Sequence, residues 1–217
     1  MTGERKYYWG AFAVILALLV GIAVAYPQLP QRVPLHWNAH GQVNGWGPKW
    51  SLFVWGPGMM ALIILLFWAL PWLSPKQFAV DSFRATYLYI MVVVVAMLGY
   101  INLLILAAGL GMRLDISRAL IGGISLLMAL TGNVLGKVRR NFYIGVRTPW
   151  TIASEQVWNG THRFAAKTFF AGGLAGFALA IIGAPFWAPL AAILTGGLIP
   201  AAYSLILYKQ LERRGEL

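Results

Sequence analysis

The sequence predicts an all-α fold, a polytopic membrane helix bundle with six transmembrane helices, and three observations lead to it. Apolar residues make up 59% of the 217 residues and charged residues only 11%, against about 25% charged residues in soluble domains. Six separate segments are long and apolar enough to cross a bilayer. None of them alternates as a strand does, and helices satisfy their own backbone hydrogen bonds in lipid. A soluble fold and a disordered chain are therefore both excluded.

The first half of the chain carries three of the expected spans, at about 8–26, 52–70 and 85–110. The second span ends where tryptophan and proline residues begin to interrupt the apolar run. The third is longer than a bilayer requires, so we expect it to tilt or to project from the membrane.

The first span admits one other interpretation. Arg5 and Lys6, an apolar run and then Ala23-Val24-Ala25 are similar to a secretory signal peptide with its small-residue cleavage site. The apolar run is at the long end for such a peptide. We therefore expect this segment to stay in the protein as a membrane span.

The second half carries the other three spans, at about 116–135, 168–183 and 190–208. The fifth is short, so we expect it to begin earlier, with Lys167 reaching the headgroups. We take the whole chain, 1–217, as a single membrane domain. Two connections are large enough to hold a functional site, an outer loop at 27–51 and an inner loop at 137–167. Aromatic residues stand where a membrane-interface belt is expected, namely Tyr7, Tyr8, Trp9, Trp72, Trp187 and Tyr208.

Lys and Arg residues predict that both the N- and C-termini are cytoplasmic. Thirteen of the 17 basic residues then lie in inner segments and four in outer ones, which are Arg32, Lys49, Arg113 and Arg118. Such an asymmetry sets the orientation of multi-pass membrane proteins, and we expect this protein in the plasma membrane. The net charge of +11 is then explained by contact with anionic lipid headgroups, and no direct contact with nucleic acid is expected.

Acidic and amide residues limit the possible activities. The six Asp and Glu residues lie in loops, tails or first helical turns, whereas proton-driven transporters and intramembrane aspartyl proteases need carboxylates within the membrane. Asn102 and Asn133 are the deep polar residues, and we expect interhelical hydrogen bonds from both. A small transporter or exporter component, with a path past Asn102, Thr131 and Asn133, is the alternative function.

The outer loop combines turn signals with aromatic residues. Pro30 and Pro34 favour an extended start, and Asn44-Gly45 is expected at the tip of a hairpin. His36 and His40 stand four residues apart, but Pro34 and Gly41 oppose a helix that would aim both at one ion, so we predict no metal site and no cofactor. Contact with an external ligand is instead expected at His36, Trp37, Asn38 and Trp46.

The inner loop has the richer pattern. Phe142–Val146 is β-prone, and Thr148-Pro149 is a helix start with a threonine cap. A second start is possible at Ser154, with Glu155 in the first turn. From either start, Glu155, Trp158 and His162 share one face of a short amphipathic helix that leads into the fifth span. Lys137, Arg139 and Arg140 are expected to contact lipid headgroups.

Catalysis is not expected at this loop. His162 with Glu155 and Ser154 or Thr161 contains the ingredients of a hydrolase triad, but no nucleophile-elbow sequence is present. A membrane hydrolase is therefore a less favoured alternative. Partner or ligand docking is the preferred hypothesis for Asn141, Arg147, Trp150, Trp158 and His162.

Asn141-Phe-Tyr-Ile-Gly-Val-Arg147-Thr148-Pro149-Trp150-Thr151, followed by Ser154-Glu155, Val157-Trp158 and Thr161-His162, resembles the signature of the SdpI immunity-protein family. Gly132-Asn133 and Gly136-Lys137 fit the same signature. The outer loop, Pro34-Leu-His36-Trp-Asn38-Ala-His-Gly41 with Gly45-Trp-Gly47 and Lys49, looks like the small domain of unknown function that precedes it in that family. The signature residues outside the docking set are Asn133, Gly145, Thr148, Pro149, Thr151 and Glu155.

The resemblance implies a six-span bacterial membrane protein that confers immunity to a secreted hydrophobic peptide toxin. In signalling members, it implies that the toxin-loaded protein also holds a cytoplasmic transcriptional repressor at the membrane. Two positions depart from the pattern: Asn44 stands where an acidic residue is expected, and His40 is not part of the motif.

Overall fold

The computed structural model describes residues 2–38 and 41–217, and six of the helices in this part of the chain are long and apolar enough to cross a membrane. The predicted all-α fold class is therefore confirmed. The elements, in chain order, are α1 (Thr2–Ala25), η1 (Tyr26–Gln28), β1 (Arg32–Trp37), β2 (Val43–Pro48), α2 (Ser51–Phe53), η2 (Val54–Gly58), α3 (Met59–Leu73), η3 (Lys76–Phe78), η4 (Asp81–Phe83), α4 (Arg84–Gly109), α5 (Ile116–Leu135), α6 (Pro149–Ala153), α7 (Glu155–Ile181) and α8 (Trp187–Arg214).

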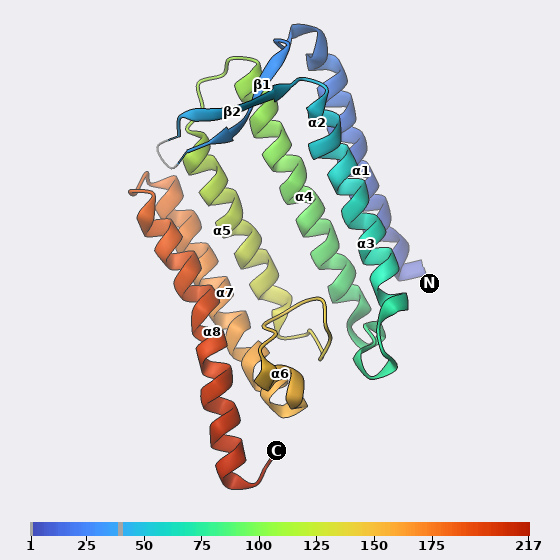
Figure 1. The fold of residues 1–217 in the computed structure, drawn as a ribbon, viewed down its shortest axis with the longest axis vertical. Coiled ribbons are helices and arrows are strands. Elements are labelled where there is room, and N and C mark those ends of the chain that lie inside the picture. The colour runs from blue at the N-terminus through green and yellow to red at the C-terminus, as the bar shows by residue number, and fades with distance from the viewer. Residues whose placement is uncertain (1, 39–40) are drawn as a thin grey trace.

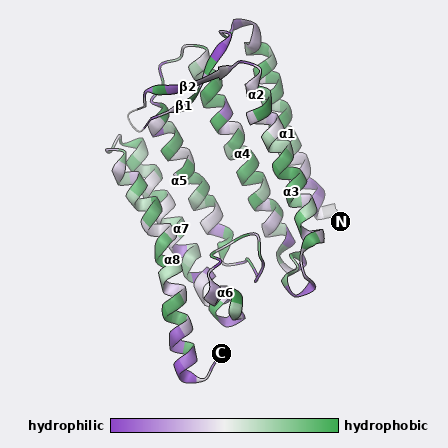
Figure 2. Ribbon diagram, in the orientation of Figure 1, coloured by the Kyte–Doolittle hydropathy of each residue, from purple (hydrophilic) through white to green (hydrophobic). Residues whose placement is uncertain are grey.

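The bundle has two different ends. The β1–β2 hairpin covers one end, which we call the outer end, and α6 with the α5–α6 connection lies at the other, the inner end (Figure 1). The first turn of α1 and the last turn of α8 both point toward the inner end. Hydrophobic residues dominate the middle of the long helices, and hydrophilic residues gather at the inner end of α8 (Figure 2).

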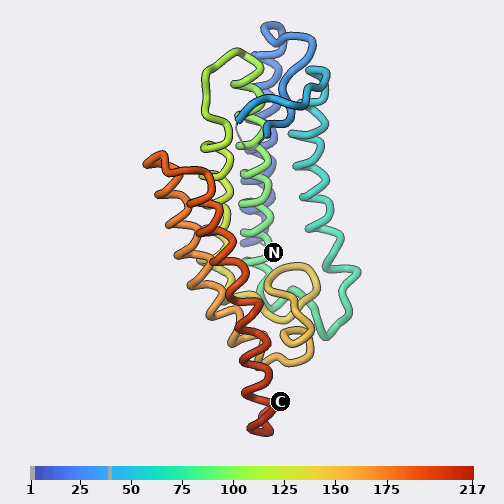
Figure 3. Tube along the Cα trace, turned by 60° about the vertical axis from the view of Figure 1, so that its left-hand side comes forward, coloured from blue at the N-terminus to red at the C-terminus, as the bar shows by residue number. Residues whose placement is uncertain are grey.

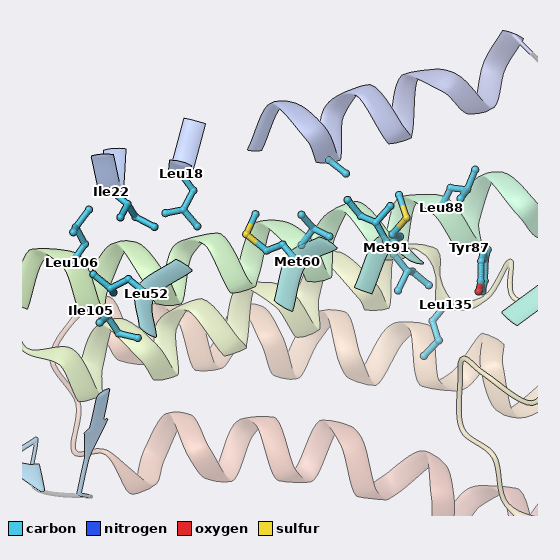
Figure 4. Packing of buried hydrophobic residues seen from close by; sticks show 14 of the residues in the cluster. Leu18, Ile22, Leu52, Met60, Tyr87, Leu88, Met91, Ile105, Leu106 and Leu135 are labelled. Carbon is cyan, nitrogen blue, oxygen red and sulfur yellow. The ribbon is translucent and has the colours of Figure 1, made fainter. Parts of the chain in front are cut away.

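The helices form two groups of three. One group contains α1, α3 and α4, the other contains α5, α7 and α8, and α4 packs against α5 where the groups meet. Figure 3 shows the same division from a second direction. In the first group large side chains fill the space between helices, among them Leu18, Met60, Met91 and Leu106 (Figure 4). Because large side chains fill this space, the helices of the first group are packed without close backbone contact and need few glycines between them.

Small residues bring the helices of the second group together. A Cβ on Gly132 of α5 would lie 2.5 Å from the backbone nitrogen of Phe170 on α7. A Cβ on Gly172 of α7 would lie 3.2 Å from Cα of Gly196 on α8. Without a side chain at these positions the backbones approach closely, which is how membrane helices gain packing energy where lipid supplies no hydrophobic drive.

The second span is not a uniform helix. Between α2 and α3 it widens into a π-helical turn, η2, which contains Pro57. Asn102 on α4 lies against this turn, fully buried, and its Nδ2 donates to the carbonyl oxygen of Leu52 over 3.3 Å. This is the interhelical hydrogen bond expected from Asn102. Asn133, by contrast, is exposed and has no hydrogen-bond partner among the described residues, so the same expectation is wrong for Asn133. It fails because the apolar pattern of α5 did not show which face turns inward.

The two asparagines provide a matched pair of variants. Asn102→Leu removes a buried bond and should lower the free energy of unfolding by about 1 kcal/mol. Asn133→Leu should change it by less than about 0.5 kcal/mol, because nothing is bonded there. The measurement is unfolding of the purified protein by SDS in mixed micelles. Equal effects of the two variants would show that the Asn102 bond contributes no stability.

The hairpin forms, but its tip is not at the expected residues. β1 and β2 pair antiparallel, with Arg32 opposite Pro48 and Trp37 opposite Val43. The reversal is closed by Asn38 and Gln42, whose main chains and side chains are hydrogen bonded to one another. Asn44-Gly45 therefore lies inside β2, where Gly45 faces His36 at a register shift. The prediction was wrong because the bonds between Asn38 and Gln42 close the reversal earlier in the chain, so that Asn44-Gly45 is paired with β1.

Lys49 fixes the hairpin to the membrane helices. Its Nζ donates to the carbonyl oxygens of Tyr26 (3.2 Å) and Leu29 (3.4 Å), just after α1 ends. The same ammonium lies 4.5 Å from the centre of the Tyr26 ring. A cation at carbonyl oxygens just beyond the helix end is favourable, so the hairpin is held over the outer end of the bundle.

Candidate functional site

The inner loop is shorter than expected, because residues 155–167 belong to α7. It is the α5–α7 connection, residues 136–154 with α6 inside it, and it is the most heavily hydrogen-bonded part of the loops. Its central polar residue is Asn141, which is fully buried. Its Oδ1 accepts from the backbone nitrogens of Tyr143 (2.7 Å) and Ile144 (2.8 Å), and its Nδ2 donates to the carbonyl oxygens of Arg139 and Ile144. All the bonds that one amide side chain offers are used.

This arrangement corrects the expectation of a strand at Phe142–Val146. The segment is irregular in the structure. Asn141 captures the backbone groups of Tyr143 and Ile144 that a strand would pair with a neighbour, and such local side-chain bonds compete with sheet formation. Asn141 is thus the residue that shapes this part of the loop.

The first turns of α7 hold the loop from beneath. Ser154 caps α7 by accepting from the backbone nitrogen of Val157, so α7 runs without a break from Glu155 through the fifth span. Trp158 and His162, one turn apart, are fully buried and stacked, with ring centres 4.0 Å apart. Glu155 is exposed. The separate amphipathic helix of the sequence analysis is therefore the first part of a long membrane helix.

His162 and Trp158 each bind the backbone of the loop. Trp158 Nε1 donates to the carbonyl oxygen of Val138 over 2.8 Å. The backbone nitrogen of Val146 donates to His162 Nε2 over 3.0 Å, so the ring proton is on Nδ1, which donates to the carbonyl oxygen of Trp158 at 2.9 Å. Both ring nitrogens are thereby occupied. The loop is fixed at two points, one on each side of Asn141.

Gly145 lies directly against the His162 ring. Its φ is +116°, a conformation that side chains disfavour, and a Cβ there would overlap Nε2 of His162. Only glycine allows the backbone to come close enough for Val146 to bond with the imidazole. Glycine is therefore required at position 145 of the signature because His162, also part of the signature, lies against it.

The Thr148-Pro149 start forms α6 as expected. Thr148 and Thr151 cap each other in a capping box. Thr151 Oγ1 also donates to the carbonyl oxygen of Val146 over 2.8 Å. Thr148 Oγ1 bonds to Ser204 Oγ on α8 at 2.9 Å. The inner loop is thus tied to the sixth span through a serine that the sequence analysis did not single out, although a hydroxyl in an apolar span is a signal worth following.

The inner loop also reaches the other helix group. Phe142 packs against Phe78 in η3, with ring centres 4.2 Å apart and the ring planes tilted by 55°. The guanidinium of Arg140 lies 5.3 Å from the centre of the same Phe78 ring and donates to the carbonyl oxygen of Ile152. Nothing in the sequence pointed to Phe78. The loop therefore connects the α3–α4 turn to α7 and α8.

Arg147 and Trp150 are the docking candidates that remain accessible. Arg147 is exposed and donates to the carbonyl oxygen of Phe142, and Trp150 is half-buried. Asn141, Trp158 and His162 are fully buried, so they shape the loop from inside and offer no surface to a partner. Around Arg147 the inner end is basic, with exposed Lys76, Lys137, Arg139, Arg163, Lys167, Lys209, Arg213 and Arg214.

The outer candidates lie on the hairpin and do not form one cluster. His36 Nδ1 and Asn44 Oδ1 are 2.5 Å apart, so the asparagine at the departing position bonds to the histidine. Trp37 packs partly into the core, Trp46 is half exposed, and Asn38 closes the turn. His40 lies outside the described residues. Among the described residues, no three His, Cys, Asp or Glu side chains gather as metal ligands would.

Comparison with known proteins adds to this geometry. Residues 137–206 match the SdpI/YfhL protein family, and residues 12–61 match a domain of unknown function (DUF1648). The first match covers the inner loop with α7 and most of α8. The second covers the latter part of α1, the hairpin, and the chain as far as the start of α3. The protein "Immunity protein SdpI" of Bacillus subtilis (strain 168) is 26% identical over 178 residues, which is 82% of this chain and 81% of that protein. No solved structure matches the chain.

Proposed function

Because this chain belongs to the SdpI family of multi-pass membrane proteins, we propose that it is an immunity protein of the bacterial plasma membrane that protects the cell from a secreted hydrophobic peptide toxin. The observation that carries this proposal is the similarity to an immunity protein over 82% of the chain. The geometry supports it, because the family signature coincides with the hydrogen-bonded inner loop.

The orientation is part of the proposal. Basic side chains are concentrated at the end that carries the inner loop, and Lys and Arg favour the cytoplasmic side. The hairpin with Trp46 would then face the outside, where a toxin arrives. Trp46 is more than half exposed, which suits contact with a hydrophobic peptide at the membrane surface.

A signalling role is the second part of the proposal. A cytoplasmic transcriptional repressor would meet the inner end at Arg147 and Trp150, the two accessible members of the signature. The inner loop touches both helix groups, through Phe78 on one side and Ser204 on the other. A change in how the groups pack would therefore reach the surface that a repressor binds.

No enzymatic step is included in the proposal. Both nitrogens of His162 are bonded to the backbone, and Ser154 Oγ accepts from Val157 as a helix cap. A transporter is also not favoured, because Asn102 is buried and bonded to the carbonyl oxygen of Leu52, whereas Asn133 is exposed on α5. The two amides therefore do not line one polar path.

Survival of a sensitive strain tests the proposal. The chain is expressed in Bacillus subtilis 168 that lacks its own SdpI, and survival is counted in co-culture with the unmodified strain. We expect protection at least tenfold above empty vector. Arg147→Ala should lose most of it at equal membrane abundance, because the variant removes an exposed charge and leaves the buried bonds of the loop in place.

Arg163→Ala is the matched control, since Arg163 is also an exposed cation at the inner end and has no hydrogen-bond partner in the described part of the chain. It should protect like the parent chain. If the chain gives no protection while the Bacillus subtilis protein does, immunity to that toxin is excluded. If both variants protect fully, Arg147 has no part in it.

A further inference from the structure

A hollow of about 630 Å³ lies where the two helix groups meet, between α4, α5 and α7. Its α4 wall runs from Val92 to Tyr100, and its α5 wall runs from Asp115 to Leu130. Fifteen residues of α-helix extend about 22 Å. The walls are apolar except at the outer end. Most of this hollow lies on α4 and α5, outside the segments that match known families.

Small residues and one tyrosine build the hollow. Ala96 and Gly122 line it and leave room that larger side chains would fill. Tyr100 crosses from α4 to α5, where its hydroxyl donates to the carbonyl oxygen of Ala119 over 2.9 Å and its ring rests on Gly123. This contact holds α4 and α5 in a fixed relation. Ala96 and Leu126 are exposed, so the hollow is a groove that is open to the surrounding lipid.

Two charges stand at the outer rim of the groove. Asp115 caps α5 by accepting from the backbone nitrogen of Arg118, and its other oxygen lies 3.4 Å from Arg118 Nε. Both side chains are about half exposed, at 56% and 51%. The Nη groups of Arg118 rest on Gly183 at the end of α7 and have no hydrogen-bond partner in the described part of the chain. The rim therefore presents one anion and one cation, both facing water.

We propose that this groove binds one phosphatidylethanolamine molecule from the outer leaflet, with an acyl chain along α4 and α5, the phosphate at Arg118 and the ammonium at Asp115. Guanidinium groups bind phosphate through paired N–H donors. The rim has no net charge, which complements a headgroup that also has none. An anionic headgroup has no ammonium to pair with Asp115, so this carboxylate would face the phosphate without compensation, which is unfavourable.

The length of the groove favours a lipid over a peptide. One leaflet, hydrocarbon and headgroup region together, is about 20–22 Å thick, and the groove runs about 22 Å from Leu130 to the rim. A transmembrane peptide helix needs about 30 Å of apolar contact. The length of the groove thus matches the length of one lipid molecule in a single leaflet.

Native mass spectrometry of the purified full chain tests the proposal. The protein is given equal amounts of phosphatidylethanolamine and phosphatidylglycerol with identical acyl chains, and the retained lipids are counted. We expect one retained lipid, with phosphatidylethanolamine preferred about fivefold, the effect of one exposed charge pair. Asp115→Asn keeps a helix cap but gives the rim a net positive charge, so it should reverse the preference toward phosphatidylglycerol.

Ala96→Phe fills the groove from its exposed edge and should lower retention of both lipids at least fivefold. Ala61→Phe is the matched control, because Ala61 is exposed to lipid on α3 and does not line the groove; it should retain lipid like the parent. Equal retention of the two lipids by the parent chain, or equal retention by the two phenylalanine variants, would overturn the proposal. A dimer that Ala96→Phe abolishes would also overturn it and assign the groove to a second copy of the chain. Because this experiment measures bound lipid, a negative result would exclude the lipid site without bearing on the proposed immunity function.

Discussion

Gly145→Ala should unfold the inner loop and abolish protection, with the largest effect of any single methyl group in this part of the chain. The added Cβ would overlap Nε2 of His162, and the backbone at this position has φ +116°. The imidazole cannot move aside freely, because it is fully buried and stacked on Trp158. Either the ring leaves its place or the loop lifts from α7.

Each of these responses breaks bonds that hold the loop. If the ring leaves, the bonds from Val146 and to the carbonyl oxygen of Trp158 are lost. If the loop lifts, Val146 loses its acceptor and Thr151 is displaced from the Val146 carbonyl oxygen. Two broken buried bonds with a strained backbone amount to about 3 kcal/mol or more.

Trypsin reports on this change directly, because Arg139, Arg140 and Arg147 lie in the loop. Gly145→Ala should speed cleavage at these sites at least tenfold in detergent-solubilised protein, and it should lower the stability to SDS. Gly111→Ala is the control that distinguishes backbone strain from steric overlap. Gly111 also has a positive φ, +81°, but a Cβ there would have nothing within 4 Å. Gly111→Ala should lower the free energy of unfolding by about 1 kcal/mol and leave trypsin cleavage of the inner loop unchanged. Similar cleavage rates in the two variants would show that the contact with His162 does not hold the loop.

The sequence predicted most of the architecture because lipid imposes a simple rule on helices. The span expected at 116–135 coincides with α5, where Asp115 supplies the cap and Gly136 the end. The expected early start of the fifth span is at Glu155, since Ser154 caps α7 well before the apolar run begins. The pattern could not show the face that each helix turns inward, and for that reason Asn133 was misjudged while Asn102 was not.

The candidate site was predictable in its residues and not in its contacts. The motif picked out Asn141, Gly145 and His162, but it could not show that the loop folds back so that His162 accepts from Val146, 16 residues earlier, with Gly145 against its ring. Phe78 and Ser204 meet the loop from distant elements and carry no local signal. The groove between α4 and α5 arises from the packing of two helix groups, which periodicity within one helix does not determine.

Gly173→Ala should destabilise the second helix group by about 2–4 kcal/mol, a range typical of overpacking between closely packed helices. A Cβ on Gly173 would overlap the backbone of α5, lying 2.6 Å from the carbonyl oxygen of Ser125 and closer still to the nitrogen of Ala129. Backbone atoms cannot rotate away as side chains do, so α5 and α7 must separate. Gly197→Ala is the control, because its nearest neighbour would be 3.9 Å away; it should leave stability unchanged or raise it slightly.

A second variant distinguishes a backbone clash from a side-chain clash within the same interface. A Cβ on Gly176 would meet Ser125 Oγ at 2.7 Å, while its other neighbours lie at 3.3 Å. Ser125→Ala removes that oxygen, whose bond is to its own helix at Ile121. We therefore expect Ser125→Ala to restore most of the stability lost in Gly176→Ala and none of that lost in Gly173→Ala, measured by SDS unfolding in mixed micelles. Rescue of both variants, or of neither, would mean that α5 and α7 do not approach through these glycines, and the tight second helix group would have to be rebuilt around other contacts.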